Sequence, residues 1–97
     1  MDVVERDILA KTLFFEAGST QEIFDIIFVG WVIRNRVERQ DRLGRWFGKN
    51  YIEVCLKKKQ FSCWNGKTFS KIKAMNIPNS WRWKTCLMLA EYIMSCP

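Results

Sequence analysis

Apolar residues recur at helical spacing along much of the chain, and short polar segments interrupt them. Together with the capping residues discussed below, this pattern predicts helices over about residues 3–15, 20–39, 50–56 and 80–95. In the first of these, Val4, Ile8 and Thr12 lie on one stripe that continues to Glu16. We therefore expect this helix to end at Glu16, on the side that faces the core.

The helix over residues 20–39 is predicted to be the most apolar. One face carries Ile23, Ile26, Ile27, Gly30, Ile33 and Val37. Phe24, Phe28 and Trp31 cover much of the remainder, so we expect this helix to be surrounded on most sides. Gly30 lowers helix propensity by roughly 1 kcal/mol relative to Ala, which favours a close crossing with another helix at that residue.

Capping residues support three of these boundaries. Ser19 and Glu22 have the spacing of a capping box before the second helix. Asn50 and Ser80 stand where the third and fourth helices would begin, and both are preferred N-cap residues. Each of these helices therefore has a predicted start.

The pattern changes over residues 60–69. Short apolar stretches flank Asn65-Gly66, a dipeptide typical of two-residue hairpin turns. We therefore predict one small β-hairpin there, followed by a basic linker over residues 71–79. Four helices and one hairpin give an α+β fold that is mainly α.

Composition narrows the class of protein. A chain of 97 residues with 48% hydrophobic and 14% aromatic content predicts one globular domain with a single core. The net charge of +6 indicates a polyanionic partner, which could be nucleic acid, an anionic membrane or bacterial cell wall. Residues 23–33 are too short to span a bilayer, and no signal peptide is predicted at residue 1.

No metal or cofactor is expected. The chain has no His, and its four cysteines lack CxxC spacing, which argues against a zinc site. Disulfides and free thiols both remain open for Cys55, Cys63, Cys86 and Cys96.

Glu16 is the strongest candidate for chemistry. Phe14 and Phe15 would remove water from its carboxyl group, and the negative end of the helix dipole disfavours its charge. Both effects favour the neutral acid that a general acid requires. The alternative is an ordinary solvated Glu at a helix end.

Three short motifs, taken in order, resemble the cell wall hydrolases typified by spore-cortex-lytic enzymes. They are Phe15-Glu16-Ala17, then Val32-Ile33-Arg34-Asn35-Arg36-Val37, then Gln60-Phe61-Ser62-Cys63-Trp64. The resemblance covers about residues 8–64.

The resemblance implies a lysozyme-like fold and cleavage of the glycan strands of peptidoglycan, with Glu16 as the acid. It also implies lytic transglycosylase chemistry, in which a hydroxyl of the sugar itself attacks the anomeric carbon; a muramidase would need a second carboxylate. Family members carry a further segment after the last helix, so residues 1–97 are expected to be one C-terminally shortened domain. Reaching a wall without a signal requires lysis, a phage holin or specialised export.

Further site residues are expected in two of the motifs. On a strand, Gln60 and Ser62 would share one face, where Gln60 could bind a sugar and Ser62 could hydrogen-bond the reacting carboxylate. Trp64 could stack on a sugar or belong to the core. We interpret Asn35 and Arg36 as structural, with Asn35 joining the helix end to a neighbouring loop.

Two other functions remain open. A small basic helical module could bind nucleic acid through its arginines at positions 34, 36, 39, 42 and 45. No helix with exposed base-reading residues stands out, so nucleic acid is the less favoured partner. The third possibility is a catalytically inactive domain that binds the wall or a protein partner.

Overall fold

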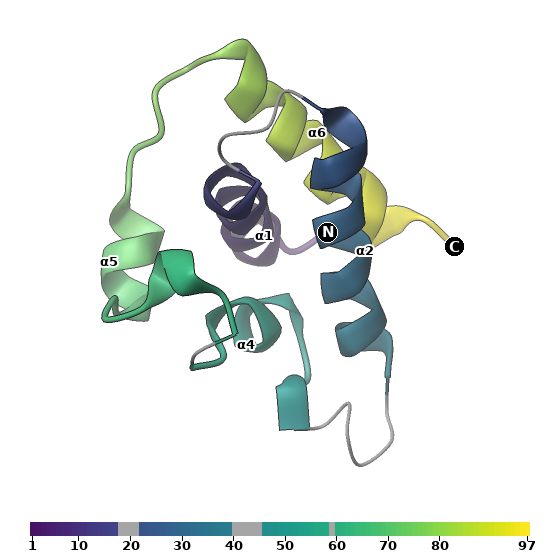
Figure 1. Cartoon of the computed structure of the whole chain (residues 1–97), viewed down its shortest axis with the longest axis vertical. Helices are drawn as coiled ribbons and strands as arrows, with labels where there is room; N and C mark the ends of the chain where they lie inside the picture. The colour runs from purple at the N-terminus through teal and green to yellow at the C-terminus, as the bar shows by residue number, and fades with distance from the viewer. Residues whose placement is uncertain (18–21, 40–45, 59) are drawn as a thin grey trace.

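The structure is a computed structural model that describes residues 1–17, 22–39, 46–58 and 60–97. Every regular element in these ranges is helical (Figure 1). The elements are α1 (Val3–Glu16), α2 (Ile23–Glu38), α4 (Tyr51–Leu56), the 3-10 helix η1 (Ser62–Trp64), α5 (Phe69–Ala74) and α6 (Trp81–Ser95). The four predicted helices are confirmed as α1, α2, α4 and α6, with small shifts at their ends.

Helix α1 is the centre of the molecule. It contacts α2, α4, α5, α6 and η1, which surround it in Figure 1. The six consecutive residues 8–13 are all buried, so every face of the helix is covered at this level. Asp2 caps its start by accepting hydrogen bonds from the backbone N–H groups of Val4 and Glu5.

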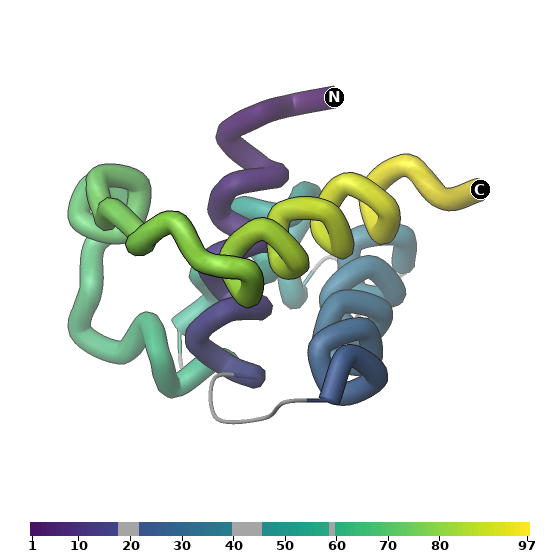
Figure 2. Tube along the Cα trace, turned by 90° about the horizontal axis from the view of Figure 1, so that it is seen from above, coloured from purple at the N-terminus to yellow at the C-terminus, as the bar shows by residue number. Residues whose placement is uncertain are grey.

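Helix α6 crosses both α1 and α2 (Figure 2). At the contact with α2, Gly30 is buried against Ile93, which confirms the close crossing predicted from the glycine. The expectation that α2 is surrounded on most sides is wrong. Phe24 and Phe28 are 80% and 69% exposed, because α1 takes the central position and α2 lies beside it, in contact with α1, α4 and α6.

The predicted β-hairpin and the α+β class are also wrong, and with them the lysozyme-like arrangement of helices and hairpin. Residues around Asn65-Gly66 do form a turn, in which Gly66 has a φ of 76° and Lys67 N–H donates to the Trp64 carbonyl over 3.0 Å. The flanking residues are helical, however: η1 precedes the turn, and the Thr68 side chain caps α5 immediately after it. No segment on either side is therefore extended enough to pair as a strand.

Helix α5 also replaces the first half of the predicted linker over residues 71–79. Lys11 of α1 binds the C-terminal part of α5, because its buried Nζ donates to the carbonyl oxygens of Ile72 and Lys73, each over 3.0 Å. In the described part of the chain, no helix is long and apolar enough to cross a membrane. Ser19, Arg42 and Arg45, for which the sequence analysis predicted roles, lie outside the described residues.

Candidate functional site

Glu16 is the last residue of α1, as predicted, and its side chain is half-buried. Directly after Glu16, the Ala17 N–H donates a hydrogen bond of 3.1 Å to the Leu13 carbonyl at the end of the helix. Beside it, the Phe15 ring meets the Trp64 ring edge to face, with centroids 5.6 Å apart. The carboxyl group therefore lies at the edge of an aromatic cluster that joins α1 to η1.

The negative charge of Glu16 also affects Cys63 of η1. Burial, and after it the negative charge of Glu16, raises the pKa of the Cys63 thiol to about 12. A thiol with this pKa is protonated at neutral pH, so Cys63 is not a reactive nucleophile there. This effect agrees with the ring contact between Phe15 and Trp64, which brings η1 to the end of α1.

Trp64 fixes η1 to α1. Its indole Nε1–H donates to Thr12 Oγ1 over 2.9 Å, and the Thr12 hydroxyl in turn donates to the Ile8 carbonyl over 2.8 Å. Thr12 lies one turn before Glu16, so η1 docks on the same stripe of α1 that ends in the carboxyl group. Trp64 is only 6% exposed, so most of its ring belongs to the core rather than to a sugar-stacking surface.

Gln60 and Ser62 are placed differently from the prediction. The strand that would give them a common face is absent, because Ser62 begins η1 and Gln60 precedes it in a turn. Ser62 is exposed and Gln60 is half-buried. Within the described residues, no hydrogen bond joins either side chain to Glu16.

The second motif meets the third through Arg36. Its guanidinium carbon lies 4.5 Å from the centroid of the Phe47 ring and 5.8 Å from that of Phe61. Arg36 thus joins the end of α2 to the segment before η1. Asn35 is exposed, and its backbone carbonyl accepts the hydrogen bond that closes α2.

Arg82 is a site residue that the sequence interpretation missed. From α6, its Nη2 donates to the carbonyl oxygens of Phe14 and Ala17, over 3.0 and 3.2 Å, and so spans the backbone on both sides of Glu16. The guanidinium also lies 4.8 Å from the Phe14 ring centroid. In the sequence, Arg82 is distinguished only by its position between Trp81 and Trp83. This position does not show where the Arg82 side chain points.

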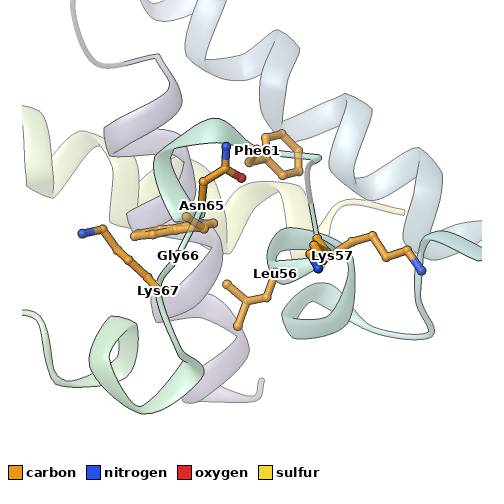
Figure 3. A pocket seen from close by; sticks show the side chains of 8 residues that line it. Leu56, Lys57, Phe61, Asn65, Gly66 and Lys67 are labelled. Carbon is orange, nitrogen blue, oxygen red and sulfur yellow. The ribbon is translucent and has the colours of Figure 1, made fainter.

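An open pocket of about 420 Å³ lies beyond Trp64, between the end of α4 and the turn after η1 (Figure 3). Trp64 lines it, together with Leu56, Phe61 and three lysines, whereas Glu16 does not. Trp64 thus lines the pocket and also contacts Phe15, the neighbour of the candidate acid.

The described residues contain no group of three or more His, Cys, Asp or Glu side chains that could hold a metal ion. Comparisons with known protein families, with curated proteins and with solved structures found no match to this chain.

Proposed function

We propose that this protein cleaves the glycan strands of peptidoglycan, with Glu16 as general acid and base. The observation that supports this is the convergence of the three motifs. Phe15 contacts Trp64, Arg36 contacts Phe61, and, after burial, the charge of Glu16 contributes to the raised pKa of Cys63. Segments that are far apart in the sequence are thus joined by a series of contacts that begins beside the half-buried Glu16.

In the proposed reaction, Glu16 donates its proton to the glycosidic oxygen while the bond from that oxygen to the anomeric carbon breaks. A hydroxyl of the same sugar then attacks the anomeric carbon, and its proton passes to Glu16, which restores the acid. This route needs one carboxylate only, because no water has to be activated on the opposite face. Glu16 makes no ion pair with another described residue, so its carboxyl group is not neutralised by one of them.

The experiment is to incubate purified peptidoglycan with the protein and analyse soluble products by mass spectrometry. We expect products that end in anhydro-muramic acid. Products that end wholly in reducing sugar would mean hydrolysis and would require a second carboxylate, for which Glu22 and Asp25 are the nearest in sequence. A folded protein that releases no product from any wall would overturn the proposal and favour an inactive wall-binding or partner-binding domain.

Access to the substrate is part of the proposal. The protein would reach the bacterial wall after lysis, through a phage holin or by specialised export.

A further inference from the structure

The pocket beyond Trp64 has apolar walls and a basic rim. Leu56 and Lys57 contribute from the end of α4, Phe61 precedes η1, and Trp64 and Lys67 belong to η1 and the turn after it (Figure 3). Lys58 lines the pocket as well. Its volume of about 420 Å³ is within the range of small-ligand sites.

A second pocket, of about 390 Å³, adjoins the first and shares Leu56 and Lys57 with it. Trp46 and Phe69 line this second pocket, and their side chains are 53% and 38% exposed. Lys57 Nζ lies 4.5 Å from the centroid of the Trp46 ring, on the boundary between the two pockets. The two pockets thus meet at residues of α4, and we call them together the α4 groove.

Charge restricts what the α4 groove could bind. Lys57, Lys58 and Lys67 line it, whereas Glu53 is the one carboxylate among the lining residues described. An acidic ligand fits this distribution. The exposed aromatic rings add flat apolar surfaces on which the face of a sugar ring can stack.

We propose that the α4 groove binds an acidic glycan strand, with Trp46 and Phe69 stacking on sugar rings and the three lysines pairing with carboxylates. The identity of the strand as peptidoglycan rests on the proposed function. The groove would then hold a part of the polymer that is not being cleaved, and Trp64 would connect it physically to the helix that carries Glu16.

The test measures binding without cleavage. The Glu16→Gln protein is sedimented with purified peptidoglycan sacculi, with sacculi whose carboxylates have been amidated, and separately titrated with single-stranded oligothymidine. Two variants are added in the same background, Trp46→Ala and the double change Lys57→Gln with Lys67→Gln. Their matched controls are Trp81→Ala and Lys84→Gln, exposed residues of α6 that do not line the groove. Thermal melting verifies that each variant is folded.

We expect each groove variant, and amidation of the wall, to weaken binding to sacculi by roughly tenfold, while the controls stay within about twofold of the parent. Equal loss in groove and control variants, or no binding of the parent, would overturn the inference. Oligothymidine that binds as tightly as sacculi and responds to the same variants would assign the groove to nucleic acid instead. Binding through the groove in a protein that cleaves no wall would refute only the proposed function.

Discussion

Gly30 of α2 lies directly against Ile93 of α6, so closely that a Cβ atom at residue 30 would collide with Ile93 Cδ1. Ile93 is fully buried and has little room to move away. Gly30→Ala should therefore lower the free energy of unfolding by about 1–3 kcal/mol through overpacking, less the ~1 kcal/mol that Ala gains in helix propensity.

A double-mutant cycle isolates this contact. Ile93→Val removes Cδ1, so in that background Gly30→Ala should cost much less, with a coupling of about 0.5–3 kcal/mol. Urea unfolding of the four proteins measures it. Additive changes would show that the two side chains do not meet.

The hydrogen bond from Trp64 Nε1 to Thr12 Oγ1 should stabilise the attachment of η1. Thr12→Val keeps the shape of the side chain but leaves the buried indole N–H without an acceptor, which we expect to cost about 1–3 kcal/mol. Thr85→Val is the matched control, because the Thr85 hydroxyl donates only within its own helix, to the Trp81 carbonyl over 2.9 Å. Equal losses of stability in the two variants would argue against the special role of Thr12.

Arg82 should act on cleavage through the backbone that presents Glu16. Arg82→Met keeps an aliphatic side chain against Phe14 but removes the bonds to the Phe14 and Ala17 carbonyls. We expect product release from peptidoglycan to fall by roughly 10–10²-fold, since small displacements of a reacting group have effects of this size. Lys84→Met, an exposed change on the same helix, serves as control. A folded Arg82→Met protein with the parent rate would exclude this positioning role.

Buried thiols should make the protein less stable in alkali. Burial raises the pKa of Cys55 and Cys63 from 9.0 to about 12, and that of Cys86 from 9.0 to about 11. Above about pH 9 the unfolded chain loses these protons while the folded protein keeps them, so stability falls as pH rises. Lys11 opposes this, because burial lowers its pKa, but it is one group against the three thiols and Tyr51, whose pKa burial also raises.

Urea unfolding at about pH 8 and about pH 10 measures the alkaline loss. Cys86→Ala should make the loss smaller, whatever it does to stability at the lower pH. A free energy of unfolding that is unchanged between the two pH values would contradict this account of the thiols.

Local signals in the sequence were sufficient for most helix boundaries. Asn50 caps α4 by accepting from Glu53 N–H over 2.9 Å, and Ser80 caps α6 by accepting from Trp83 N–H over 3.1 Å. The apolar stripe correctly predicted that the first helix ends at Glu16. These features depend on neighbours within one helical turn, which the sequence displays directly.

Features that depend on distant partners were not predictable in the same way. Asn65-Gly66 specifies a turn, but whether its flanks pair as strands is decided elsewhere, by the bond from Trp64 to Thr12 and by the Thr68 cap. Arg82 binds backbone carbonyls 65 and 68 residues away, and such acceptors carry no side-chain signal. The exposure of Phe24 depends on which helix becomes central, and the periodicity of α2 alone does not settle that.

The most direct test of the central claim compares Glu16→Gln with the parent protein on purified peptidoglycan, with product release followed by mass spectrometry. Glutamine keeps the size and hydrogen bonding of the neutral acid but cannot deliver a proton. We expect an intact fold by circular dichroism and a loss of roughly 10²–10⁴-fold in product release, while Glu38→Gln, an exposed residue of α2, retains the parent rate. A folded Glu16→Gln protein that cleaves at the parent rate would contradict the account.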